Sequence, residues 1–191
     1  MLTGQQLIKA IAQLPVLPLQ GTVFRFIHLK YQNTPLSAIG SFQRGGRYNI
    51  PKDFSVLYTS DTPITALREV RILTETATGL IAHKAEPQIM LSIEYNLKAI
   101  VDLKNPNNQN LLGTNIQELT GVWLPMNLQG QIAPTQELGT AIRASQQIEA
   151  LKVPSAHQAD AYNLAIFPDR LAPGSLLQVY DESGTMSAQL P

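Results

Sequence analysis

The chain has 191 residues, no cysteine, and 14 Lys plus Arg against 14 Asp plus Glu, which gives a net charge of zero. A domain of this size buries roughly 70% of the surface that its unfolded chain exposes, so its core needs neither a disulfide nor a metal ion. Zero net charge offers no electrostatic attraction to nucleic acid or to an anionic membrane, and the lack of cysteine excludes thiol nucleophiles and thiolate metal sites.

Charged residues make up 15% of the chain, against about 25% in a typical soluble domain. Either a partner protein covers part of the surface, or the Asn and Gln side chains solvate it. The N-terminal segment MLTGQQLIKAIAQL lacks the pattern of a signal peptide, and no run approaches the roughly 20 apolar residues of a membrane helix. We therefore expect a cytoplasmic protein without a membrane span.

The first half of the chain predicts helices and strands in alternation. Residues 3–14 have a helical period that ends before Pro15, and residues 21–29 alternate as a strand. Residues 54–60 form a second expected strand. Ser60 or Asp61 then offers an N-cap for a helix that runs from Pro63 to about residue 73, with Glu69 in its middle.

The second half begins with the most apolar expected strand, at residues 88–103, with a break near Asn96. Asn-rich turns follow, then a helix over residues 135–147, and three short strands around Leu151, Leu164 and Leu177. There are no repeats and no long linker, so the sequence predicts one α+β domain over residues 1–191.

The segment from Arg44 to Glu69 is the richest in candidate functional residues. Gly45 and Gly46 lack a Cβ, so the backbone there can approach a ligand closely or adopt positive φ. Arg44 and Arg47 flank this pair, and a guanidinium binds phosphate in a two-pronged manner. The segment therefore suggests an anion cradle followed by a carboxylate.

Each feature of this segment also has a structural interpretation. Arg47 can instead pair with Asp53 or Asp61, and the glycine pair can simply close a turn. Tyr58 alternates with Val56 and is equally compatible with core packing. The three histidines lack metal-ligand spacing, and there is no dinucleotide fingerprint, P-loop or nucleophile elbow.

Several motifs in a fixed order resemble the RES-domain family, whose members are NAD-degrading toxins of bacterial toxin–antitoxin modules. The matching runs are FRF at 24–26, GGRYN at 45–49, VLYTSDTPITALREV at 56–70, VPSA at 153–156 and NLAIFP at 163–168. They span residues 21–168, whereas residues 105–131 match nothing in the family that we can place.

The resemblance implies six site residues. The family's arginine, glutamate and serine correspond to Arg47, Glu69 and Ser155, its strand tyrosine to Tyr58 and its upstream arginine to Arg25, while Tyr48 stands where the family commonly has Trp. By this resemblance Glu69 is expected to stabilise a cationic ribose and Arg47, with Arg25 or Arg44, to hold a pyrophosphate. Tyr58 would stack on nicotinamide, and Ser155 would orient Glu69 or the ribose.

The resemblance also implies a fold like the diphtheria-toxin-type ADP-ribosyltransferases, with two facing antiparallel sheets surrounded by helices. The implied activity is cleavage of the nicotinamide–ribose bond of NAD, as an NAD phosphorylase or glycohydrolase. NAD is then the substrate, inorganic phosphate a co-substrate in the first case, and no metal or bound cofactor is required.

An antitoxin, in this family often with a helix-turn-helix part, is the implied partner. The sequence leaves open which molecule accepts the ADP-ribose, which antitoxin binds the protein and whether a homo-oligomer forms. Two alternatives also stay open: an ADP-ribosyltransferase that modifies a macromolecule, and a catalytically idle module that binds NAD or ADP-ribose.

Overall fold

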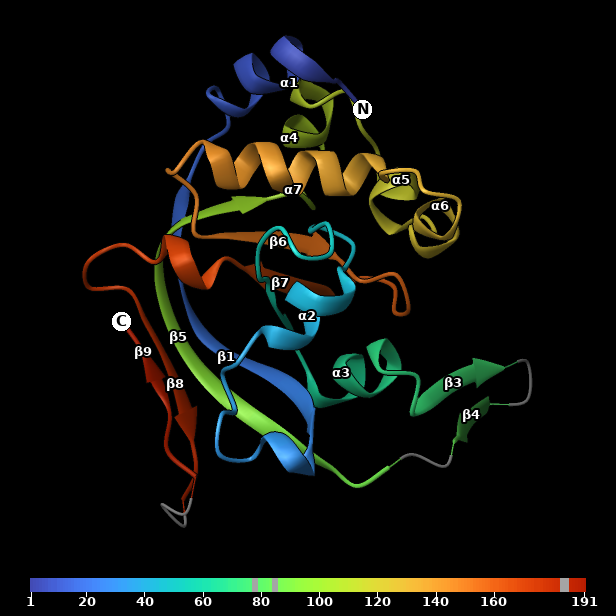
Figure 1. Ribbon diagram of the computed structural model, residues 1–191, viewed down its shortest axis with the longest axis vertical. Helices are drawn as coiled ribbons and strands as arrows, with labels where there is room; N and C mark the ends of the chain where they lie inside the picture. Colours follow the sequence, from blue (N-terminus) through green and yellow to red (C-terminus); the bar gives the residue numbers. More distant parts are fainter. Residues whose placement is uncertain (77–78, 84–85, 183–185) are drawn as a thin grey trace.

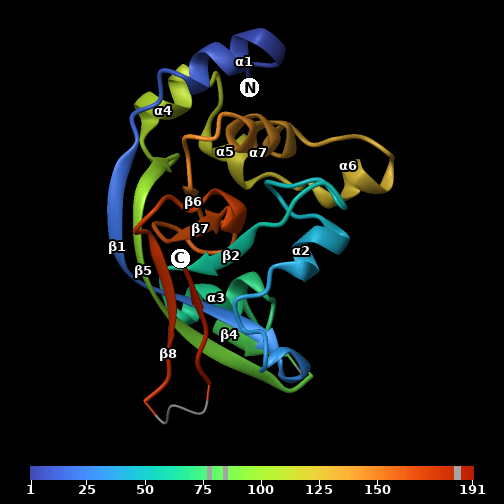
Figure 2. The ribbon, with the colours of Figure 1, turned by 60° about the vertical axis from the view of Figure 1, so that its left-hand side comes forward.

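The main sheet of the protein closes on itself. The computed structural model describes residues 1–76, 79–83, 86–182 and 186–191. In this part of the chain the strands of a seven-stranded sheet follow the order β1-β2-β7-β6-β5-β8-β9, and a further pairing of β1 with β5 joins the first strand to the fifth. Figure 1 shows β1 and β5 as long curved strands, and Figure 2 shows them side by side.

The strands are β1 (Leu17–His28), β2 (Leu57–Ser60), β3 (Leu73–Thr76), β4 (Gly79–Ala82), β5 (Gln88–Asp102), β6 (Ala150–Pro154), β7 (Tyr162–Ile166), β8 (Leu176–Tyr180) and β9 (Gln189–Leu190). The helices are α1 (Gly4–Ile11), α2 (Ile39–Arg44), α3 (Pro63–Glu69), α4 (Pro106–Leu111), α5 (Ile116–Thr120), α6 (Leu124–Leu128) and α7 (Pro134–Ala144), with short 3-10 turns η1 (Leu29–Tyr31) and η2 (Pro168–Arg170). Strands β3 and β4 form a separate hairpin that stands off the main sheet (Figure 1).

The core lies on both faces of the sheet, and β7 contributes to both because its successive side chains point to opposite sides. Ala165 packs with α1 and α7, while Leu164 and Ile166 pack with β1, β5 and β8. This is why the run NLAIF is apolar at successive positions instead of alternating. The largest fully buried side chains include Leu138, Ile142, Leu151 and Phe167 toward the helices, and Ile93, Leu97 and Leu164 toward the long strands.

Most of the expected elements are present. The first helix, the 21–29 strand and the three late strands are confirmed as α1, β1, β6, β7 and β8, although α1 ends at Ile11 instead of residue 14 and β1 begins earlier, at Leu17. The strand expected to break near Asn96 is wrong in that detail, since β5 runs unbroken. Asn96 pairs with both Gln20 and Leu176, so strand neighbours on either side hold it in the sheet.

Helix α3 differs from the expectation at both ends. Its N-cap is Thr62, whose side chain accepts a hydrogen bond from the backbone N–H of Thr65, and not Ser60 or Asp61. Its last residue is Glu69, because Val70 leaves the helical conformation and Arg71 adopts a positive φ of 59°. The carboxylate therefore lies at the end of the helix and not in its middle.

The α+β class is confirmed, with a difference in the sheets. One main sheet curves round and closes, where two facing antiparallel sheets were expected, and β5 pairs with β6 in parallel. The closed curvature is what brings strand β2 and the β6–β7 pair close to α3. In the described ranges no helix has the length and apolar character needed to cross a membrane.

Candidate active site

Glu69 is held by two side chains that donate to the same carboxylate oxygen. Ser155 Oγ donates to Glu69 Oε1 at 2.6 Å, and Asn163 Nδ2 donates to Oε1 at 2.7 Å. The other oxygen, Oε2, has His157 Nε2 at 3.9 Å and no closer partner in the described part of the chain. The Glu69 side chain is 26% exposed, and Oε2 accepts no hydrogen bond from the described residues.

Asn163 and His157 are site residues that the sequence analysis missed. Asn163 lies in the NLAIFP run, where an amide at the start of an apolar strand gives no sign of its partner. His157 is one of the three histidines for which the sequence indicates no metal-ligand role, but its backbone N–H donates to Ser155 Oγ at 3.2 Å, and its ring Nε2 lies 3.9 Å from Glu69 Oε2. The spacing of two residues between Ser155 and His157 was the only available signal.

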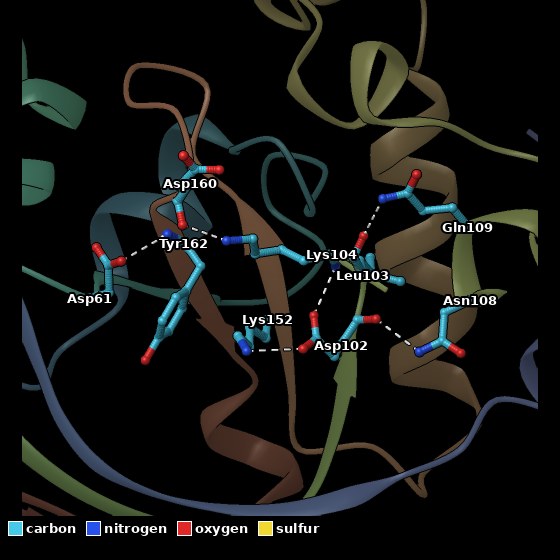
Figure 3. A network of polar contacts seen from close by, with 9 residues as sticks. All are labelled: Asp61, Asp102, Leu103, Lys104, Asn108, Gln109, Lys152, Asp160 and Tyr162. Carbon is cyan, nitrogen blue, oxygen red and sulfur yellow. Dashed lines mark hydrogen bonds and ion pairs between the residues drawn. The ribbon is translucent and has the colours of Figure 1, made fainter. Parts of the chain in front are cut away.

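Polar contacts fix the loop between β6 and β7, which carries Ser155 and His157. Asp61, which directly follows β2, accepts a hydrogen bond from the backbone N–H of Tyr162 at 3.0 Å (Figure 3). Lys104 Nζ donates to the carbonyl of Asp160, a residue with a positive φ of 62°. The far end of the loop is thus tied to the segments that follow β2 and β5. Further contacts in Figure 3 join neighbouring elements through Asp102 with Lys152 and Asn108, and Leu103 with Gln109.

Arg47 lies in a tight turn that is anchored from several sides. Gly46 and Asn49 bridge across the turn, and Gln136 of α7, fully buried, donates to the carbonyls of both. Arg47 Nη1 donates to the carbonyl of Gly121, between α5 and α6. Among the described residues no carboxylate pairs with Arg47, so the expected alternatives Asp53 and Asp61 do not neutralise it.

The glycine pair is explained by contacts within the protein. Gly45 has a φ of 72°, which favours glycine. A Cβ on Gly46 would lie 2.5 Å from Tyr58 Oη, so the close approach at this position is to Tyr58. Tyr58 Oη accepts from the backbone N–H of Tyr48 and donates to Asn49 Oδ1, both at 2.9 Å. The turn-closing interpretation of the glycine pair is therefore the one that the geometry supports.

Tyr48, the neighbour of Arg47 in the turn, is a buried core residue. Its side chain belongs to the core and is 1% exposed, and its hydroxyl has no hydrogen-bond partner in the described part of the chain. Burial raises the pKa of Tyr48, the charge of Arg47 lowers it and the charge of Glu69 raises it. Burial likewise raises the pKa of Tyr58. Both phenols stay protonated at neutral pH.

Arg25 is a partly buried cation on β1. Burial lowers its pKa to about 10, so it remains charged at neutral pH. Its Nη1 donates to the carbonyl of Pro35 at 3.5 Å, and no carboxylate in the described ranges pairs with it. No described hydrogen bond or ion pair links Arg25 to Glu69, and Arg44 ends α2 with an exposed side chain.

The geometry gives a mixed α+β domain with a tethered carboxylate, Glu69, and two arginines, Arg25 and Arg47, that pair with no carboxylate in the described ranges. The family model of the RES domain matches residues 22–187, so the chain belongs to the RES-domain family. A search of curated proteins finds no match. Among solved structures, a chain in the crystal structure of the M. tuberculosis MbcT–MbcA toxin–antitoxin complex is similar in fold. It has a TM-score of 0.64 and 18% identity, over 98% of this chain and 93% of that one.

Proposed function

We propose that the protein is the toxin of a toxin–antitoxin pair and that it cleaves the nicotinamide–ribose bond of NAD. Membership of the RES-domain family and the likeness in fold to a chain of a toxin–antitoxin complex support the toxin role. The observation that carries the chemistry is the arrangement of Glu69, with one oxygen tethered by Ser155 and Asn163 and the other without a described hydrogen bond, 3.9 Å from His157 Nε2.

A carboxylate in this position suits the reaction. Nicotinamide in NAD is already cationic, and it leaves as a neutral molecule with the electron pair of the bond, so no strong general acid is needed. Positive charge then develops on the ribose. A fixed anion that accepts hydrogen bonds from the ribose hydroxyls stabilises that charge, and Oε2 of Glu69 is the available oxygen.

The two arginines suit the rest of NAD. Arg25 and Arg47 donate to backbone carbonyls and pair with no carboxylate in the part of the chain that the structure describes, so both keep donors for a pyrophosphate. Ser155 acts through Glu69, to which it donates its hydrogen bond. The half-buried Tyr58 is assigned to the nicotinamide side, and Tyr48 supports the turn that carries Arg47.

Phosphate or water accepts the ADP-ribose. In the first case the protein is an NAD phosphorylase, and in the second it is an NAD glycohydrolase. Incubating the purified protein with NAD, with and without phosphate, distinguishes the two through ADP-ribose 1-phosphate or free ADP-ribose as product. ADP-ribose found on a macromolecule would instead identify a transferase.

The cellular test uses Glu69→Gln as the matched control. Expression of the wild-type chain in bacterial cytoplasm without an antitoxin is expected to lower NAD and arrest growth, while Glu69→Gln at equal soluble level is tolerated. Normal growth and normal NAD with soluble wild-type protein would contradict the toxin role and favour an idle binding module.

A further inference from the structure

Two chains of hydrogen bonds converge on one oxygen of Glu69, and each chain has a fixed direction. In the first, the backbone N–H of His157 donates to Ser155 Oγ, and Ser155 Oγ donates to Glu69 Oε1. In the second, Ser60 Oγ donates to Asn163 Oδ1 at 2.7 Å, and Asn163 Nδ2 donates to Oε1. The sequence motifs assign no role to Ser60 or Asn163.

Ser60 determines which way the Asn163 amide faces. Ser60 and Asn163 are direct partners across the antiparallel β2–β7 pair, and Ser60 is 4% exposed. The single hydroxyl proton of Ser60 goes to the amide oxygen, so the amide nitrogen must face Glu69. If the amide were reversed, its oxygen would face Glu69 Oε1, and no proton would be available for a hydrogen bond between these two acceptors.

The position of Glu69 at the end of α3 makes these donors necessary. Carbonyl groups at the C-terminal end of a helix disfavour a negative charge, so an anion there needs donors from outside the helix. Ser155 comes from the β6–β7 loop and Asn163 from β7, and both use the same oxygen. Because both donors use Oε1, Oε2 receives no described hydrogen bond, and its nearest described partner is the ring of His157, with Nε2 at 3.9 Å.

We infer that Ser60 and Asn163 are positioning residues, which hold Glu69 through Oε1 so that Oε2 faces the reacting ribose. This inference rests on the proposed cleavage of NAD. We call the chain of hydrogen bonds from Ser60 through Asn163 to Glu69 the relay. The inference predicts that loss of the relay impairs turnover more than NAD binding, because the contact of Oε2 with the ribose strengthens as positive charge develops.

The kinetic test compares Ser60→Ala with Thr59→Val. Thr59 is the adjacent residue of β2, is equally buried, and donates its hydroxyl to the carbonyl of Leu164, away from Glu69. Ser60→Ala is expected to lower kcat of nicotinamide release by about tenfold with little change in KM, whereas Thr59→Val leaves kcat near wild type. An equal decrease of kcat in the two variants, or an effect of Ser60→Ala on KM alone, would overturn the inference.

Asn163→Asp gives a second readout, the pH dependence of kcat, which tests whether the carboxylate beside residue 163 is the one that governs turnover. It keeps the shape of the side chain but places a second carboxylate beside Glu69. Two neighbouring carboxylates resist double ionisation, so the acidic limb of the pH–kcat profile is expected to move to higher pH. An unmoved limb in a folded Asn163→Asp variant would count against the relay.

Crystal structures of Ser60→Ala and Thr59→Val separate the relay from the proposed function. If wild-type protein releases no nicotinamide, the proposed function fails, and the relay is judged on geometry alone. Loss of the contact between Asn163 and Glu69 in Ser60→Ala, with that contact intact in Thr59→Val, supports the relay. An unchanged Glu69 in Ser60→Ala overturns it.

Discussion

At the residue scale, the protein separates the two charges that its proposed chemistry needs. Glu69 receives all its described side-chain hydrogen bonds on Oε1, and Arg47 donates to a backbone carbonyl instead of to an acid. If these two groups were paired with each other, a ligand would have to break an ion pair before binding. Tyr48, whose pKa is influenced by both charges, is a neutral core residue.

Arg47→Ala is expected to weaken NAD binding itself. The pyrophosphate is present before and during the reaction, so its contact contributes to both states, and loss of a charged hydrogen bond is worth roughly 1.5–3 kcal/mol, or about 10- to 100-fold in Kd. Isothermal titration with NAD measures this change. Arg143→Ala serves as control, since it removes the same charge from the ion pair with Asp169. Equal affinity in wild type and Arg47→Ala would remove Arg47 from the phosphate site.

At the element scale, the apolar runs predict the strands well, and the functional contacts poorly. Strands β6, β7 and β8 follow from their apolar composition, whereas the end of α3 depends on the left-handed conformation of Arg71, a residue with no intrinsic preference for it. The contact between Ser60 and Asn163 depends on strand register across 103 positions of sequence. Register of this kind is a property of the closed sheet, and no local pattern encodes it.

The packing of the Arg47 turn on β2 gives an element-scale prediction. In Gly46→Ala the new Cβ would lie 2.5 Å from Tyr58 Oη, so Tyr58 must move and lose its bonds to Tyr48 and Asn49. We expect a loss of about 1–3 kcal/mol in the free energy of unfolding, measured in urea. Gly40→Ala is the matched control, because a Cβ at that position in α2 meets nothing within 4 Å. A Gly46→Ala variant as stable as Gly40→Ala would refute this account of the turn.

At the scale of the whole molecule, a buried carboxylate just before β6 binds β5 and the segment that leads into β8. Glu149 is 1% exposed and accepts hydrogen bonds from the backbone N–H groups of Lys98, Ala99 and Ala172 and from Ser175 Oγ. Burial acts to raise its pKa, but these four donors, Ser175 foremost, together lower it below the ordinary value of 4.5. Lys98 and Ala99 lie in β5, Ala172 lies in the segment after η2, and Ser175 lies immediately before β8.

Acid stability follows from the direction of this shift. Because the folded-state pKa of Glu149 is depressed, its stabilisation is fully present above pH 4.5 and is lost as pH falls through the lower folded value. Glu149→Gln is therefore expected to cost about 1–3 kcal/mol in urea unfolding near neutral pH and less at about pH 3. Glu94→Gln, at an exposed position of β5, should change little at either pH. A Glu149→Gln cost that stays constant with pH would contradict the assignment.

The most direct measurement is the rate of nicotinamide release from saturating NAD by purified wild-type and Glu69→Gln proteins, with NAD affinity measured in parallel. The account predicts release by the wild type and a kcat about 30- to 1000-fold lower in Glu69→Gln, equivalent to roughly 2–4 kcal/mol of transition-state stabilisation, with affinity nearly unchanged. No nicotinamide release by the wild type, or equal turnover by Glu69→Gln, would contradict it.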